Sequence, residues 1–462
     1  MQRPARVAAS PPSCCWLAAG LVACLAPVAV QAQPTAGDAG FSFSGTQRTR
    51  YERLDPQFRA DIGPNDTALA LQTSLNFGWR GERVRVFGEV MDSRVEWNDA
   101  GSYLSTSLVD TLEPVQAYVE WRRGSGEQTG AGSTLRVGRM TADLGKRRVL
   151  ARSRYRNTVD TFTGLDWQWR GADGRTTRVF GARPMSILPD DDPSLLDNDF
   201  ELDELTAHSY LVALYHQWAP FADDSIAEAY ILDYEREPTS DPDFDPEDAA
   251  DHTTVGTRFY RPAMAGRWSY EVEVMLQRGR AGDAQRTGLR HRASLLHAEV
   301  GYQFDAPWSP NVLLQFDDAS GDRNPNDAHN ERFDTLFGDR SFDFGPTGIL
   351  GIAARANLES PALRATLRPR PHWRWTLLYR RLRLDEPRDE WVSSDYRDET
   401  GAAGDSIGRY FEASAAWTAI EDRLTVETGI ARLAAGRFAK QTAGPAFGGD
   451  PRYFYLTATT SF

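Results

Sequence analysis

Tyr453-Phe-Tyr-Leu-Thr-Ala-Thr-Thr-Ser-Phe462 are the last ten residues of the chain, and their side chains alternate without interruption. Successive side chains of a strand point to opposite faces, so the segment predicts a strand with one mainly apolar face. That face carries Phe454, Leu456, Ala458, Thr460 and Phe462, and the other carries Tyr453, Tyr455, Thr457, Thr459 and Ser461. Such a strand at the end of a chain is typical of a closed barrel, where the last strand pairs with the first and no edge remains free.

The N-terminus resembles a secretory signal peptide. Arg3 and Arg6 form a short basic region, an apolar stretch runs over residues 14–30, and Val30-Gln-Ala32 fits a cleavage site. We therefore expect a signal peptide at 1–32, a short periplasmic segment at 33–40 and a barrel domain at 41–462. Leu21-Val-Ala-Cys24 leaves processing as a lipoprotein open as an alternative.

Cysteine content and charge narrow the chemistry of the mature chain. All three cysteines, Cys14, Cys15 and Cys24, lie within the expected signal peptide, which excludes disulfides, thiolate nucleophiles and cysteine-ligated metals afterwards. Residues 1–32 contain two arginines and no acidic residue, so their removal takes the formal net charge from −13 to −15. Mean hydropathy is uninformative for barrels, because every strand averages a lipid-facing and a water-facing side.

Alternation with a period of two continues along the whole chain and predicts about eighteen antiparallel transmembrane strands. The polar partners include charged residues, which a water-filled lumen tolerates and the core of a soluble sandwich does not. The segments begin near Phe41, Leu69, Val84, Val115, Leu135, Leu165, Arg178, Tyr210, Ile226, Thr253, Trp268, Ser294, Val312, Ile349, Trp373, Phe411, Leu424 and Tyr453.

The connections and the tryptophans distinguish the two ends of this barrel. Connections after even-numbered strands are mostly short and those after odd-numbered strands mostly long, so long extracellular loops oppose short periplasmic turns and both termini are periplasmic. Seven tryptophans end even-numbered strands or begin odd-numbered ones, which predicts an aromatic belt at the periplasmic rim of an outer-membrane protein. These are Trp79, Trp121, Trp169, Trp218, Trp268, Trp373 and Trp417.

Several motifs resemble those of the alginate-export outer-membrane proteins. They are Gly138-Arg-Met-Thr-Ala-Asp-Leu-Gly-Lys-Arg-Arg-Val149, Arg154-Tyr-Arg-Asn157, Ala319-Ser-Gly-Asp322, Glu331-Arg-Phe-Asp-Thr-Leu-Phe-Gly338, Gly408-Arg-Tyr-Phe-Glu412 and Gly436-Arg-Phe438. The resemblance covers roughly residues 41–462, and it implies an eighteen-stranded monomeric barrel that conducts a polyuronate past a constriction lined by arginine and lysine. The turn Ile420-Glu-Asp422 is shorter than in dedicated alginate secretion channels, where a periplasmic segment covers the pore, so gating by that segment is not expected.

Basic residues are concentrated between Arg136 and Arg156, where eight cations face a single acid, Asp143. In a chain of net negative charge this is a segregated positive field, and folded into the lumen it would concentrate anions. Arginine suits this role because its planar fork binds carboxylates and phosphates through two hydrogen bonds. Lipopolysaccharide phosphates are the alternative partner for these arginines. The predicted pore residues are Arg48, Arg50, Arg139, Lys146, Arg147, Arg148, Arg152, Arg154, Arg156 and Arg332.

Metal and catalytic motifs are weak. Asp241-Pro-Asp-Phe-Asp245 lacks the glycine and closing glutamate of an EF-hand, so a solvated external loop is the better interpretation. Asp251 and His252 are adjacent and would point to opposite faces of a strand. His297 and Glu299 share one face, where polar filling accounts for them. We therefore predict no metal, no cofactor and no enzymatic activity.

These patterns predict a passive outer-membrane channel for an anionic polysaccharide or oligosaccharide, alginate-like polyuronate in particular. Two alternatives remain: an anion-selective porin for small solutes, and a structural or surface-interaction barrel that conducts nothing. The expected partners are the acidic saccharide, outer-membrane lipid and lipopolysaccharide, the barrel-assembly machinery and periplasmic secretion proteins. A nucleic-acid partner is not expected.

Overall fold

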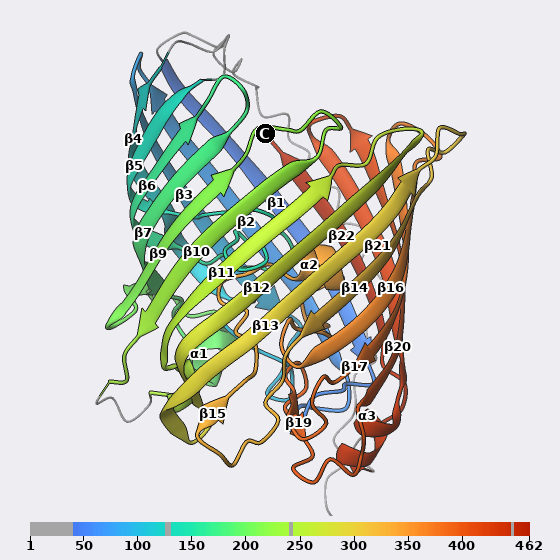
Figure 1. Cartoon of the computed structure of the whole chain (residues 1–462). Helices are drawn as coiled ribbons and strands as arrows, with labels where there is room; N and C mark the ends of the chain where they lie inside the picture. Colours follow the sequence, from blue (N-terminus) through green and yellow to red (C-terminus); the bar gives the residue numbers. More distant parts are fainter. Residues whose placement is uncertain (1–39, 125–130, 240–243, 445–447) are drawn as a thin grey trace, which may run out of the picture.

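The computed structural model describes residues 40–124, 131–239, 244–444 and 448–462. Within these residues the chain forms a closed antiparallel barrel with eighteen strands in its wall (Figure 1). Closure is made by the first and last strands, which pair antiparallel with Arg48 opposite Thr459. The prediction from the C-terminal segment is thereby confirmed. The predicted signal peptide and residues 33–39 lie outside the described residues.

The wall strands follow each other in chain order, each paired with its neighbours in the sequence. They are β1 (Gly40–Asp55), β2 (Asp66–Arg80), β3 (Val84–Glu96), β4 (Asp110–Arg123), β5 (Gly132–Met140), β6 (Phe162–Arg170), β7 (Thr176–Ser186), β9 (Ser209–Gln217), β10 (Ile226–Arg236), β11 (Ala250–Arg261), β12 (Arg267–Asp283), β13 (Arg286–Gln303), β14 (Asn311–Ala319), β16 (Leu358–Leu367), β17 (Trp373–Arg383), β20 (Ser406–Ile420), β21 (Leu424–Ala435) and β22 (Arg452–Ser461).

The remaining elements are short and belong to the loops. They are α1 (Asp192–Asp197), β8 (Glu204–Leu205), the 3₁₀ helix η1 (Pro246–Asp248), β15 (His329–Asn330), α2 (Ser341–Phe344), β18 (Glu390–Trp391), β19 (Tyr396–Arg397) and α3 (Arg437–Thr442). No helix among the described residues is long and apolar enough to cross a membrane.

The two ends of the barrel differ as the sequence predicts. Short turns and the C-terminus lie at the upper end in Figure 1, and α1, β15, β19 and α3 lie at the lower end with the long loops. One connection at the long-loop end is short, because β12 and β13 continue beyond the wall as a hairpin with a turn at 284–285. The upper end is therefore the periplasmic side and the lower end the extracellular side.

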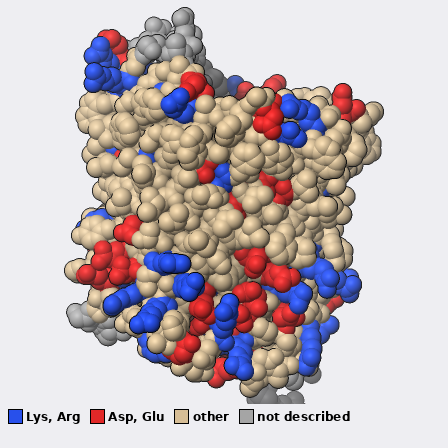
Figure 2. All heavy atoms as spheres, viewed as in Figure 1, with Lys and Arg blue, Asp and Glu red and all other residues tan. Residues whose placement is uncertain are grey.

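The outer surface carries a band of exposed apolar side chains, as contact with membrane lipid requires. On β12, Val272, Val274 and Leu276 are exposed, whereas Glu271 and Glu273 are buried on the lumen side. Figure 2 shows a broad band of uncharged atoms across the middle of this face, with charged residues gathered at the long-loop end. The exposed tryptophans beside the short turns include Trp79, Trp121, Trp218, Trp268 and Trp417. This arrangement places the chain in the outer membrane.

One predicted strand is wrong. The segment that begins near Ile349 belongs to the loop 320–357, and the wall strand begins later, at Leu358. Ile349 and Leu350 are buried inside the barrel, where Arg59 donates a hydrogen bond of 2.7 Å to the carbonyl of each. Their apolar side chains are buried in a contact between loops inside the barrel. A short apolar run of this kind has the same hydrophobicity pattern as a buried strand, so the pattern alone does not distinguish the two.

Candidate functional site

Two long loops fold back into the barrel and pack against each other. The first inner loop, residues 141–161, connects β5 and β6, and the second, residues 320–357, connects β14 and β16. Leu150 and Phe337 form a parallel bridge between them, and the N–H of Ala151 donates to the carbonyl of Phe337 at 2.9 Å. Figure 1 shows α2, part of the second loop, inside the barrel at mid-height. Together the loops narrow the lumen, and we refer to them as the plug.

Arg148 anchors the plug to the wall. Its buried guanidinium donates to Asp343 of the second inner loop at 2.9 Å, to Glu271 of β12 at 2.6 Å and also to Glu273. Arg355 reaches the same Asp343 carboxylate at 2.6 Å. Burial alone would raise the pKa of Asp343, but the Arg148 and Arg355 guanidiniums hold it well below its usual range. Arg148 is thus fully engaged within the protein.

The two predicted arginines of β1 hold the backbone of the first inner loop. Arg48 donates to the carbonyl of Arg156 and Arg50 to the carbonyl of Tyr155, each at 2.6 Å. Arg50 also pairs with Glu52 at 2.5 Å, and both of those side chains are buried. Both arginines face the lumen, but their guanidinium N–H groups are used in hydrogen bonds to the backbone of the plug.

Arg139 lies in a cage of acids at the extracellular end of the lumen. It donates to Asp203 at 2.6 Å, to Thr161 at 2.9 Å and also to Glu113. Its side chain is only 12% exposed. This residue is therefore enclosed by the protein and offers little charge to a solute.

Three further predicted residues are also paired. Arg152 binds Glu89 of β3 through two hydrogen bonds, of 2.7 and 2.9 Å, and Arg156 forms an ion pair within the first inner loop. Arg332 lies apart from the rest, because it joins Asp389 and Glu247 of the external loops. The structure thus brings the predicted set together around the plug, although Arg332, itself a residue of the second inner loop, contacts the external loops.

Lys146 and Arg154 are the most exposed cations of the set, and Arg147 and Arg156 are partly exposed. The side chain of Lys146 is 41% exposed, and its Nζ lies 3.8 Å from the nearest Glu271 oxygen. Arg154 is 53% exposed and pairs with Asp143, which is itself partly exposed. The side chain of Arg147 is 24% exposed, and its guanidinium lies 3.9 Å from the nearest oxygen of Asp339. These charges are the ones that the plug presents to water in the lumen.

Sequence reasoning missed a second basic group, on the wall towards the periplasm. Arg80 and Arg85 lie opposite each other on β2 and β3, and Arg170 ends β6. None of the three has a carboxylate partner among the described residues. Arg136 and Arg178 face the lumen nearby, paired with Glu120 and Asp166. Their inward position in the strand alternation was the signal that could have found them.

A polar cavity of about 340 Å³ lies beside this group, on the periplasmic side of the first inner loop. Its walls combine cations, amides and hydroxyls, which are the groups that bind acidic sugars. It is lined by Asp143, Leu144, Gly145, Gln168, Arg170, Gly174, Thr176, Arg178, Tyr215 and Gln217.

The histidine pairs do not form catalytic dyads. Asp251 is exposed and His252 buried, so they point to opposite faces as predicted, and His252 lies 2.9 Å from Asp334 instead. His297 bonds Asp317 of the next strand at 2.7 Å. The weak metal motif at Asp241–Asp245 lies mostly outside the described residues.

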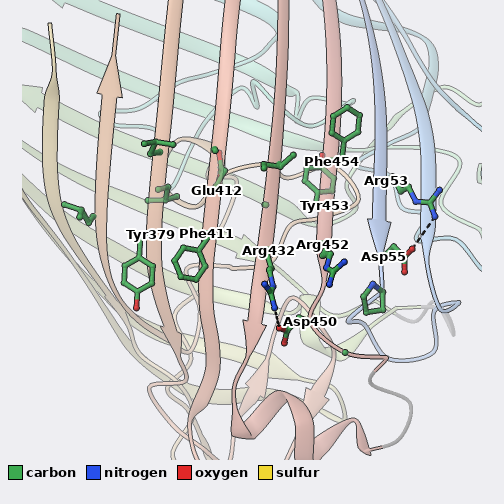
Figure 3. A pocket seen from close by; sticks show the side chains of 18 of the residues that line it. Arg53, Asp55, Tyr379, Phe411, Glu412, Arg432, Asp450, Arg452, Tyr453 and Phe454 are labelled. Carbon is green, nitrogen blue, oxygen red and sulfur yellow. Dashed lines mark hydrogen bonds and ion pairs between the residues drawn. The ribbon is translucent and has the colours of Figure 1, made fainter. Parts of the chain in front are cut away.

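A large hollow lies on the outside of the barrel. A groove of about 1180 Å³ crosses β16 to β22, and Figure 3 shows Tyr379, Phe411 and Phe454 beside it, with Arg432 and Arg452 nearby. Phe411 and Phe454 are exposed on the lipid-facing side of their strands. Since this groove faces the membrane, it is not part of the solute path.

Comparison with known proteins agrees with this architecture. The family described as alginate export matches residues 40–448. Among solved structures, the chain is similar to Pseudomonas aeruginosa OpdK with vanillate, at 13% identity and a TM-score of 0.56, over 91% of this chain and 98% of that one. Acinetobacter baumannii OccAB1 has 12% identity and a TM-score of 0.60, over 91% and 96%.

A third similar structure is P. aeruginosa OccK2 (OpdF) in complex with glucuronate, at 12% identity and a TM-score of 0.53, over 91% of this chain and 98% of that one. No curated protein sequence matches the chain. At these identities the structures support the fold, while the family match spans most of the chain. The family and these neighbours are transport channels, not enzymes. The chain belongs to the alginate export family, as an outer-membrane β-barrel channel.

Proposed function

We propose that this monomeric channel passes acidic oligosaccharides that contain uronate residues. The observation that carries the proposal is a row of accessible cations along the lumen, from Lys146 and Arg154 on the plug to Arg170 at the periplasmic cavity. Each could bind a sugar carboxylate through charge-assisted hydrogen bonds. A chain with one carboxylate per sugar could exchange from one cation to the next.

The plug favours short chains over long polymers. Arg148 ties both inner loops to β12 through buried ion pairs, and breaking such pairs is costly, so the plug is expected to stay in place during transport. A solute must then pass around a fixed obstruction. This supports oligosaccharides as the solute class, within the broader expectation of an anionic saccharide channel.

Single-channel recording in planar bilayers tests the proposal. The expected result is anion preference under a salt gradient, together with current blocks by oligouronates that lengthen with the number of sugars. A neutral oligosaccharide of equal length is the control and should block weakly. Equal blocking by both oligosaccharides would contradict a role for the lumen cations.

A small organic anion is the second candidate solute. The observation that favours it is the plug, whose two loops pack together inside the lumen, and the structurally similar OpdK was solved with vanillate. Monomeric uronate and aromatic acids should then block the current as well as an oligouronate does. The non-conducting alternative predicts no current steps at all.

We also propose that residues 1–32 are removed as a signal peptide and that the residues between it and the start of β1 at Gly40 form a short periplasmic segment. The barrel-assembly machinery, lipopolysaccharide and periplasmic secretion proteins remain proposed partners. The intact mass of the purified protein distinguishes cleavage after Ala32 from lipid attachment at Cys24.

A further inference from the structure

Three carboxylates converge at the extracellular end of the lumen. Asp110 and Glu113 lie three residues apart on β4, so regular alternation would place them on opposite faces. A bulge corrects this: the register with β3 shifts beside Glu113, and Leu112 adopts a φ of 54° with its side chain exposed. Asp203 joins them from the loop that follows β7, and one oxygen of each carboxylate lies within 4.8 Å of the others. Bulges of this kind often aim side chains at a functional site.

The charge of this cluster is not balanced. Arg139 is the cation that pairs with Glu113 and Asp203. Asp203 also accepts from the N–H of Leu188 at 3.1 Å. Asp110 is 0% exposed, and neither of its oxygens has a hydrogen-bond partner among the described residues. Three carboxylates and one guanidinium leave two negative charges in a buried place, where an unpaired charge is costly.

A second cluster of similar size shows the contrast. His297, Asp317 and Asp343 also lie within 4.8 Å of one another deeper in the lumen. There Arg380 pairs with Asp317 at 2.7 Å, and Arg355 pairs with Asp343 at 2.6 Å. That cluster is neutralised by arginines, whereas the cluster of Asp110 is not.

We infer that Asp110, Glu113 and Asp203 form a divalent-cation site suited to Ca²⁺. Calcium takes oxygen ligands at about 2.3–2.6 Å, so two oxygens on opposite sides of the ion are roughly 5 Å apart, which fits the spacing. Asp110 can supply both of its oxygens as ligands. The two positive charges of the ion balance the two negative charges that Arg139 leaves uncompensated. Bound calcium would join the start of β4 to the loop after β7 and fix the extracellular mouth of the channel.

Calcium-dependent stability tests the site in the purified full-length barrel. Heat-induced unfolding, followed on unboiled gels, should shift upwards by several degrees when calcium replaces EDTA. Asp110→Asn should abolish this shift without lowering the stability in EDTA, because the amide removes charge repulsion. Asp251→Asn, a change at an exposed rim carboxylate, should keep the shift.

Terbium luminescence gives a direct reading on the wild-type protein, independent of any variant. Saturable binding of terbium that calcium displaces is expected. A wild type that neither binds terbium nor responds to calcium overturns the site, as does an Asp110→Asn variant that keeps the full calcium response.

The outer groove supports a separate inference. Two arginine pairs lie directly opposite each other on neighbouring strands beside its extracellular end, Arg381 with Arg409 and Arg432 with Arg452. Arg432 and Arg452 line the groove, whereas Arg381 and Arg409 line an adjoining hollow that shares Arg432 with it. Like charges in this position destabilise a sheet. Asp450 pairs with Arg432 at 2.6 Å, but the other three arginines have no carboxylate partner among the described residues.

The groove joins these cations to an apolar surface. Its floor and walls carry lipid-facing apolar side chains next to the arginines (Figure 3). These side chains are Leu363, Leu377, Phe411, Ile430 and Phe454. We propose that the groove binds a phosphorylated glycolipid of the outer leaflet, with an acyl chain in the groove and phosphate among the arginines.

Native mass spectrometry of the purified barrel measures the occupancy. The double change Arg409→Gln and Arg452→Gln should lower the number of bound lipopolysaccharide molecules, whereas dephosphorylated lipid should bind the wild type weakly. The matched control is Arg278→Gln with Arg292→Gln, a directly opposed pair on the outer side of β12 and β13 that lines neither this groove nor the adjoining hollow. Equal losses in both double variants, or none in the first, would overturn the site, as would displacement of the lipid by inorganic phosphate alone.

Discussion

Replacing Lys146 by glutamate should weaken the binding of an acidic oligosaccharide by about 30-fold. The Lys146 side chain is 41% exposed and its ammonium lies 3.8 Å from the nearest carboxylate oxygen, so much of its charge is available to the lumen. A sugar carboxylate about 4 Å away gains about 1 kcal/mol at the dielectric of water and about 4 kcal/mol at an effective dielectric of 20. Solvent exposure favours the lower value, and reversing the sign doubles it to about 2 kcal/mol.

The assay is the residence time of oligouronate blocks in single-channel recordings. Lys146→Gln should give about half of the free-energy change, because it removes the charge without reversing it. Lys440→Glu is the matched control, since this is the only other lysine of the chain and it lies on α3, outside the lumen. Unchanged block by a correctly folded Lys146→Glu channel would refute the assignment of Lys146 to the solute path.

Three further predictions concern the plug, the acid cage and assembly. Arg148→Met should lower stability by about 3–5 kcal/mol by leaving buried carboxylates unpaired, and should raise conductance as the plug loosens, whereas Arg147→Met should do neither. Arg139→Glu should prevent folding, because it adds a further acid to the cage; a folded channel with reversed selectivity would contradict this. Deleting Phe462 should reduce the amount of barrel in the outer membrane while export to the periplasm continues, because that residue pairs with β1 at the closure; normal outer-membrane levels would argue against it.

The sequence was a good guide to the wall. Alternation located the strands because each has one face in lipid and one in the lumen, and this contrast repeats at every strand. It failed at Ile349, where apolar residues serve the plug, and it missed the start of β16, whose fourth residue is Pro361. It also missed how far the β12–β13 hairpin extends, since Arg278 and Arg292 continue the alternation beyond the apolar band.

The site was predictable in place but not in detail. The clustered cations left two positions open for the basic segment, the lumen and the lipopolysaccharide layer, and the structure has this segment in the plug. Its partners could not be inferred, because Arg148 meets Glu271 and Asp343 more than a hundred residues away, and such pairings depend on the register of the whole barrel. A count of the charges nearby in the sequence therefore overestimates how many arginines around the plug lack a carboxylate partner. It overlooked Arg80 and Arg170, which have no carboxylate partner among the described residues.

In the function proposed above, the lumen selects acidic oligosaccharides by its accessible cations. The most direct measurement is the reversal potential of wild-type channels under a salt gradient, repeated with oligouronate and with a neutral oligosaccharide of equal length. Wild-type channels should prefer anions, and oligouronate should suppress this preference whereas the neutral sugar should leave it unchanged. Cation preference, or an equal effect of both sugars, would contradict it.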